Sequence, residues 1–182
     1  MSTIRQMMPG ERLDLRLDWT DELPTGTVID ASDWIVGAGL TLGTEDFTDT
    51  ATRGRITFNG AKGSIYNATN RITLDDNQQD DYTVRIKGFE RIVVFIKDPE
   101  AMKDFTINWQ PMGIFAAGET ISSVAHDVPA GLTQESEGNT SYSSIVRLSG
   151  GIEGAEYRIP LTVTTSTGQL PKCILLIRVR AQ

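Results

Sequence analysis

The chain contains little of what a disulfide-linked, zinc-binding or membrane-spanning protein needs. Its 182 residues include one cysteine, Cys173, so no disulfide can form within the chain. The one histidine, His126, has no second histidine or cysteine at metal-ligand spacing, which argues against a zinc site. The longest apolar run, residues 92–96, is far shorter than the ~20 residues of a membrane-spanning helix. The amino terminus lacks the apolar core of a signal peptide, so we expect synthesis in a reducing cytoplasm.

Basic residues are also scarce and dispersed. The 17 lysines and arginines are outnumbered by 24 acidic residues, and the net charge is −7. Proteins that bind nucleic acid need clustered positive charge to displace counterions, so we expect no nucleic-acid partner. The chain shows no P-loop, no dinucleotide-binding glycine pattern and no nucleophile elbow. We therefore expect no catalytic residue, no cofactor, no metal and no enzymatic activity.

One acidic stretch, residues 75–81, contains four aspartates with an asparagine and two glutamines. Carboxylate and amide oxygens are the ligands that Ca²⁺ takes. The stretch lacks the central glycine and the terminal glutamate of an EF-hand loop, and the matching part of the chain, residues 166–171, carries no acid. A solvated hairpin tip is the favoured interpretation, and calcium binding stays open.

What the chain does contain is an internal repeat of about ninety residues. The segment from Pro9 to Trp19 returns as Pro99 to Trp109 with the same alternation of residue types. Further matches join 38–41 to 130–133, 59–66 to 150–157, 72–73 to 163–164, and 84–86 to 177–179. This period is too long for a solenoid unit and fits a small domain. We predict two domains, 1–90 with an amino-terminal arm at 1–8, and 91–182.

The apolar residues recur mostly every second position, which is typical of strands with one buried face. Residues 13–19 alternate strictly, and turn-forming Asn59-Gly60 and Gly150-Gly151 follow later runs. Six or seven short strands per repeat predict an all-β chain of two tandem Ig-like β-sandwich domains related by internal duplication. Closure into a small barrel is the less favoured alternative. Because the paired cysteines of true immunoglobulin domains are absent, "Ig-like" refers to architecture alone.

Four residues are candidates for contacts with a partner. Residues 92–96 predict the first strand of the second domain, which Pro99 ends. The matching segment, Met1–Met8, is then either the first strand of the first domain or a tail that reaches a neighbour, and its candidate contacts are Ile4, Met7 and Met8. Trp19 and Trp109 recur with the same neighbours and predict core packing. Trp34 occurs in one copy only and is our candidate for a surface contact.

The second repeat carries a series of motifs in a fixed order. Lys97-Asp98-Pro99-Glu100-Ala101 precedes the alternating strand that ends at Trp109, and Val128-Pro129-Ala130-Gly131-Leu132 follows it. Leu148-Ser149-Gly150-Gly151 and Gly154-Ala155-Glu156-Tyr157 come next. The series resembles a short domain of tailed-phage virion proteins described as fibre-tail adaptor or virion-associated proteins. The first repeat departs from it, with Met8-Pro9-Gly10-Glu11 at its opening.

The resemblance implies an Ig-like sandwich without enzymatic activity, in a structural protein of the virion that is made in the host cytoplasm. We expect its partners to be other virion proteins (capsid, neck or tail subunits), no membrane, and a symmetric homo-oligomer on the particle. A fibre-tail or neck adaptor and a capsid decoration protein both remain open. The rival interpretation is a carbohydrate- or host-surface-binding module that acts through exposed aromatic residues at one end of a sandwich. Its candidate aromatics are Trp34, Phe47, Tyr66 and Phe115.

Overall fold

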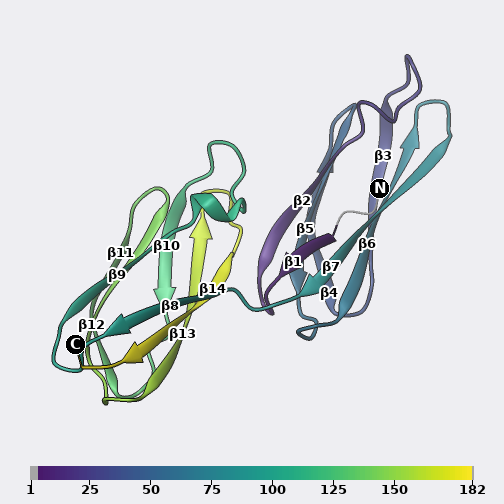
Figure 1. Cartoon of the computed structure of the whole chain (residues 1–182). Coiled ribbons are helices and arrows are strands. Elements are labelled where there is room, and N and C mark those ends of the chain that lie inside the picture. The colour runs from purple at the N-terminus through teal and green to yellow at the C-terminus, as the bar shows by residue number, and fades with distance from the viewer. Residues whose placement is uncertain (1–3, 182) are drawn as a thin grey trace. The chain divides into compact units, whose positions relative to one another are not determined.

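The computed structural model describes residues 4–181 of the chain. It divides into two compact units, Met1–Phe89 (unit 1) and Glu90–Gln182 (unit 2). Nearly every regular element in the described residues is a β-strand, and the one helical segment there is a single 3-10 turn, η1 (Gln110–Met112). Each unit consists of two sheets that enclose a core (Figure 1). The predicted all-β fold of two tandem sandwiches is confirmed.

The two units repeat the same seven strands in the same order. Unit 1 contains β1 (Ile4–Met7), β2 (Arg12–Asp18), β3 (Ile29–Val36), β4 (Leu40–Phe47), β5 (Ala51–Phe58), β6 (Ile65–Leu74) and β7 (Gln79–Gly88). Unit 2 contains β8 (Ile92–Lys97), β9 (Lys103–Asn108), β10 (Ile121–His126), β11 (Leu132–Asn139), β12 (Ser143–Gly150), β13 (Glu156–Thr165) and β14 (Lys172–Val179). Their sheets run β1-β7-β6-β3 and β2-β5-β4 in unit 1, and β8-β14-β13-β10 and β9-β12-β11 in unit 2.

The first strand of each unit lies at the edge of the four-stranded sheet. β1 pairs in parallel with β7, and β8 pairs in parallel with β14. β8 ends at Lys97, before Pro99, as the sequence predicts. In the described part of the amino-terminal arm, residues 4–7 form a strand of unit 1, which is the first of the two predicted alternatives. The remainder of that prediction, residues 1–3, lies outside the described residues.

The structure corrects one of the predicted repeat matches. Tyr66 of β6 pairs with Ile86, and its counterpart Tyr157 pairs with Ile177. Residues 84–86 therefore correspond to 175–177, two positions earlier than the sequence comparison placed them. A shift of two residues along a strand keeps every side chain on the same face, so alternation alone does not distinguish the two alignments.

Each core contains one repeated tryptophan that also carries a hydrogen bond. Trp19 and Trp109 are 3% and 0% exposed, which confirms the predicted core packing. The indole Nε1 of Trp109 donates to Ser144 Oγ at 3.0 Å, and that of Trp19 donates to Thr52 Oγ1 at 3.3 Å. A buried indole N–H needs a partner, so a hydroxyl residue occupies the facing position in both repeats.

Trp34 is also a core residue, which corrects its prediction as a surface contact. It is 2% exposed, on β3, and its ring packs against Gly54 of β5 in the opposite sheet. A Cβ atom on Gly54 would lie 2.7 Å from Trp34 Cδ2, so the indole occupies the space that a side chain would need. The backbone N–H of Trp34 donates to Glu45 Oε2 at 3.0 Å. In unit 2 His126 takes this position, and its backbone N–H donates to Glu137 Oε2 at 3.3 Å.

Gly54→Ala tests this contact between the two sheets. The added methyl group forces the Trp34 ring or the strands apart, and we expect a loss of about 1–3 kcal/mol in the free energy of unfolding of unit 1. Urea unfolding followed by tryptophan fluorescence measures it. Gly138→Ala on β11 is the matched control, because a Cβ there meets no atom within 4 Å. Equal stability of the two variants would contradict the proposed packing.

Candidate interaction surfaces

The amino-terminal strand carries three of the predicted contact residues, and only one of them is exposed. Ile4 is 51% exposed, whereas Met7 is 1% and Met8 is 6% exposed. The backbone N–H of Met8 donates to the carboxylate of the buried Glu11 at 2.8 Å. Met7 ends β1 on its inward side, as Lys97 ends β8. Met7 and Met8 are therefore core residues, which corrects their prediction as surface contacts, while a partner contact at Ile4 stays a prediction.

In unit 2 a buried lysine joins the motif at residues 97–101 to the double-glycine turn at Gly150-Gly151. Lys97 is fully buried, and its Nζ donates to the carbonyl oxygens of Asp98 at 2.8 Å and Gly150 at 2.6 Å. A longer bond of 3.4 Å reaches the carbonyl of Pro99. Burial lowers the pKa of Lys97 below its usual 10.5, and the charge of Asp98 opposes that shift. The ammonium group thus joins the main chain after β8 to the end of β12.

The motifs at residues 128–132 and 154–157 meet beside the same double-glycine turn. Gly131 has φ +99°, and a Cβ on it would lie 2.8 Å from Tyr157 Oη. That hydroxyl accepts a hydrogen bond from the backbone N–H of Ile152 at 3.2 Å. Unit 1 repeats this contact with Gly39 and Tyr66. The motif residues thus hold one end of each sandwich together, and this explains their order without a binding role.

Lys97→Met tests the contribution of the buried ammonium group. Methionine fills a similar volume, as Met7 does in unit 1, but it cannot donate to the carbonyl oxygens of Asp98 and Gly150. We expect unit 2 to lose about 1–3 kcal/mol in its free energy of unfolding. The measurement is chemical unfolding, with Lys103→Met on the exposed side of β9 as the control. A Lys97→Met variant at least as stable as the unchanged chain would show that desolvation of the charge outweighs its hydrogen bonds.

The acidic stretch, residues 75–81, comprises the turn between β6 and β7 and the first residues of β7. Its carboxylates accept hydrogen bonds from nearby groups. Asp75 Oδ1 accepts the backbone N–H of Val28 at 3.3 Å, and Asp76 Oδ1 accepts that of Gln78 at 3.0 Å. Arg71 pairs with Asp81 through two bonds of 2.8 and 2.7 Å, which lower the pKa of Asp81. Within residues 4–181 no group of three or more His, Cys, Asp and Glu side chains is placed to hold a metal ion.

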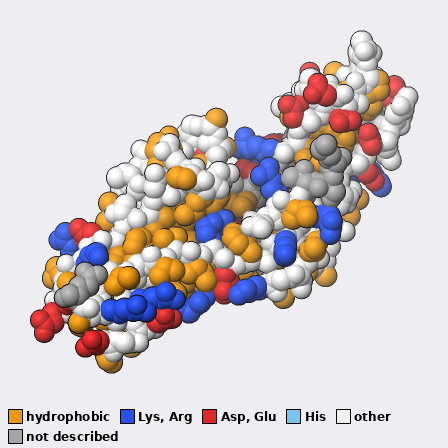
Figure 2. Space-filling view, in the orientation of Figure 1, with side chains coloured by type: hydrophobic (Ala, Val, Ile, Leu, Met, Phe, Trp, Pro, Cys, Tyr) orange, Lys and Arg blue, Asp and Glu red, His pale blue; other side chains and the backbone are white. Residues whose placement is uncertain are grey.

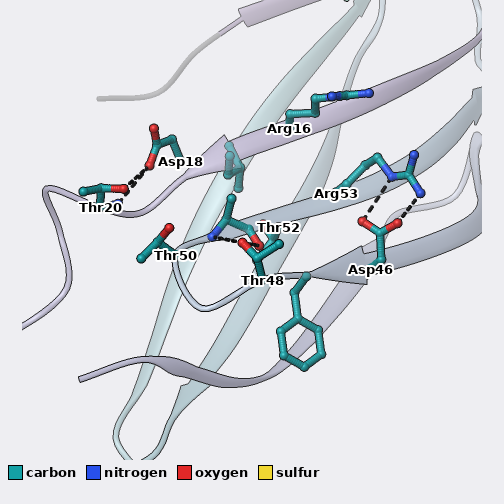
Figure 3. A pocket seen from close by; sticks show the side chains of 11 residues that line it. Arg16, Asp18, Thr20, Asp46, Thr48, Thr50, Thr52 and Arg53 are labelled. Carbon is teal, nitrogen blue, oxygen red and sulfur yellow. Dashed lines mark hydrogen bonds and ion pairs between the residues drawn. The ribbon is translucent and has the colours of Figure 1, made fainter. Parts of the chain in front are cut away.

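A depression on unit 1 lies over one end of the three-stranded sheet (Figure 3). Figure 3 shows Arg53 turned towards Asp46, to which its Nε donates at 3.1 Å, with Thr48, Thr50 and Thr52 nearby. Phe47 also lines it and is 43% exposed. Of the four aromatic residues predicted for a binding face, Phe47 is the exposed one, because Trp34 is buried and Tyr66 and Phe115 pack against the cores. In unit 2 the positions of Phe47 and Arg53 hold Asn139 and Ile145.

The outer faces of the four-stranded sheets differ between the units. In unit 2 the exposed side of β8 consists of Ile92, Val94 and Ile96, which are 41%, 47% and 43% exposed. Figure 2 shows apolar side chains gathered over this part of unit 2, with lysines and arginines along the margin. Sequence reasoning treated residues 92–96 only as a strand and missed this surface. Three apolar residues at every second position, all on the outer side, were the available signal.

Two comparisons describe the relatives of the chain. A family model described as "Podophage GP4 fiber-tail adaptor protein gp77" matches residues 7–87 and again residues 97–176. No protein of curated function matches the chain in sequence. No helix within the described residues is long and apolar enough to cross a membrane.

Solved structures give only distant similarities. An endo-fucoidan hydrolase of glycoside hydrolase family 107 is 12% identical, with a TM-score of 0.36 and coverage of 100% of this chain and 28% of that one. The titin domains Z1 and Z2 in complex with telethonin are 9% identical, with a TM-score of 0.32 and coverage of 100% and 93%. SGBP-B of the Bacteroides ovatus mixed-linkage glucan utilization locus, in complex with a mixed-linkage heptasaccharide, is 15% identical, with a TM-score of 0.29 and coverage of 98% and 44%. The chain spans less than a third of the hydrolase, and these similarities carry no argument about function.

Proposed function

Because the chain belongs to the podophage fibre-tail adaptor family, it is a structural protein of the phage virion, and we propose that it joins two other virion proteins without enzymatic activity. The observation that carries this proposal is the match of the family model to both repeats, 7–87 and 97–176. Each unit encloses its own core, so each is a separate body that can bind one partner. An adaptor of this form needs one binding surface per unit.

The differences between the two units support the proposal that each unit binds its own partner. The strand order, the core tryptophans and the glycine–tyrosine contact are the same in both units. The outer faces differ, since the depression with Phe47 belongs to unit 1 and the apolar row on β8 belongs to unit 2. Duplication followed by divergence of the outer surfaces is the pattern expected where one fold serves two partners.

A weak contact by each unit is sufficient on a symmetric particle. Many copies held by the symmetry of the tail or neck act together, and multivalent contacts raise retention by 10²–10⁴-fold over one contact. The same argument applies to a capsid decoration protein, which binds the regular lattice of the head. The two roles differ in where the chain lies on the particle.

Deletion of the gene from the phage tests the adaptor role. We expect particles with filled heads that lack fibres and do not adsorb to the host, because the fibre has lost its point of attachment. Electron microscopy of these particles and an adsorption assay give the measurement, and the gene supplied in trans is the control. Fibres that remain in place, together with lost density over the head lattice, would assign the chain to capsid decoration instead.

A second candidate function is saccharide binding in the depression of unit 1, which the exposed Phe47 ring favours. An aromatic face beside an arginine–aspartate pair and hydroxyl groups can stack on a sugar ring and hydrogen-bond to it. On a glycan array with the whole chain, Phe47→Ala would abolish binding by removing the stacking face. Ile152→Ala, an exposed apolar change in unit 2, is the matched control. The absence of binding by the unchanged chain would dismiss this candidate.

A further inference from the structure

We propose that the outer face of the β8–β14 sheet in unit 2 binds the acidic loop end of unit 1 of a second copy of the chain. The face is defined by the exposed Ile92, Val94 and Ile96 on β8, with the half-buried Ile174 and the buried Leu176 beside them on β14. The acidic end is defined by Asp21, Glu22 and Val28 between β2 and β3, and by Asp75 and Asp76 between β6 and β7. The proposal extends the proposed function, since it concerns how adaptor copies meet one another on the particle.

The apolar row on β8 continues onto the neighbouring strand. Ile92 pairs with Ile174, and Val94 pairs with Leu176, so the side chains of each pair lie next to one another on the outer face. Among the described strands β8 pairs with β14 alone, and on its other edge the carbonyl of Ile96 accepts a hydrogen bond from Lys103 Nζ. Natural sheet edges are usually protected by charge, proline or a covering segment, and an apolar edge indicates a surface that associates.

The fold itself does not require this face to be apolar, because unit 1 forms the same sheet without it. By the strand pairing, Leu176 and Ile174 correspond to Arg85 and Thr83 of β7, and Ile96 corresponds to Gln6 of β1. Of the positions in unit 1 that match this row, Ile4 is the one with an apolar residue. The four-stranded sheet of unit 2 has therefore acquired apolar residues at positions where folding accepts polar ones, which points to binding.

The charge around the face selects an acidic partner. Arg178 pairs with Glu156 at 2.7 Å and Arg158 pairs with Glu90 at 3.3 Å, on the two strands beside the row. Lys103 lies at the end of the row, where its Nζ donates to the carbonyl of Ile96 at 3.0 Å. The basic residues on or next to this face are Arg91, Lys103, Arg158, Lys172, Arg178 and Arg180, six of the eight in residues 90–182. Acidic residues on or next to this face are Glu90 and Glu156, with Asp98, Glu100 and Asp104 beyond the end of β8 near Lys103, so the basic residues are in the majority and the partner surface should be apolar with negative charge around it.

The loop end of unit 1 fits that description. Residues 1–89 contain fourteen acidic and nine basic residues, and the four acids of the acidic end are exposed. Val28 is 37% exposed at its centre, where its backbone bonds to Asp75 at 3.1 and 3.3 Å and so joins the two loops. In Figure 2 acidic side chains gather at the loop end of unit 1 that lies at the upper right. The exposed apolar residue within an acidic rim complements the apolar row within a basic rim.

Two different surfaces meet in this contact, so each copy offers one half to the next copy and one half to the previous copy. Such a heterologous contact repeats until it closes into a ring or continues as a chain. This arrangement makes a prediction that an isologous contact between two β8 edges does not make. Two variants, each defective in a different half, should restore one contact when they are mixed.

The test is sedimentation velocity of the full chain over a range of concentrations at low salt. We expect the unchanged chain to associate, and more weakly as salt rises, since salt screens the charges. Val94→Glu, which places a charge in the row, and the double variant Asp21→Lys with Glu22→Lys should each lower the association constant at least tenfold. An equimolar mixture of these two variants should form dimers and nothing larger.

Ile65→Glu, an equally exposed change on β6 of unit 1, is the matched control and should associate as the unchanged chain does. Circular dichroism checks the fold of each variant, and Ile96→Glu replaces Val94→Glu if that variant unfolds. The proposal is overturned by an unchanged chain that stays monomeric, by full association of the lysine double variant, or by a mixture that forms no dimer. These outcomes do not depend on where the chain lies on the particle, so they are distinguishable from a failure of the adaptor role.

Discussion

Each unit depends on one tryptophan that closes the space between its two sheets. The backbone N–H of Trp19 donates to the carbonyl of Thr50 at 2.8 Å, and that of Trp109 donates to the carbonyl of Tyr142 at 2.9 Å. Together with the indole bonds to Thr52 and Ser144, these contacts tie the end of β2 or β9 to the turn before β5 or β12. A large ring buries much apolar area, and its fixed hydrogen bonds leave one orientation for it. The strands can then differ elsewhere without loss of the sandwich.

The sequence was sufficient for the fold because repeat and alternation agree. Strict alternation in residues 13–19 and the recurrence of Trp19 as Trp109 predicted both the strand type and the number of sandwiches. The candidate contacts were less predictable, since three of the four are buried. Trp34 has no tryptophan at its repeat position, and the absence of a side chain at Gly54, twenty positions away in the opposite sheet, makes room for it. Lysine is seldom buried, so the residue type of Lys97 did not indicate that its side chain lies inside the sandwich.

The comparison of the two repeats separates structural from functional residues in a way that a single copy cannot. The glycine pair Gly39 and Gly131 and the tyrosine pair Tyr66 and Tyr157 are retained because they hold one end of each sandwich together. Positions on the outer sheet face are not retained. The apolar residues of β8 and β14 correspond to polar residues of β1 and β7, except at Ile4. The motifs that identify the family thus describe how the domain is built. The exposed residues that distinguish one repeat from the other are not needed for the fold.

The parallel pairing of β8 with β14 has a consequence for synthesis on the ribosome. Unit 1 is complete once β7 has left the ribosome, since all seven of its strands then exist. Unit 2 begins with β8, whose only partner among the described strands is the last one to be made. About eighty residues separate the paired positions Ile92 and Ile174, so the apolar edge strand stays unpaired until β14 has been made. Loss of β14 would therefore leave the middle of that sheet unfilled and β8 without its partner.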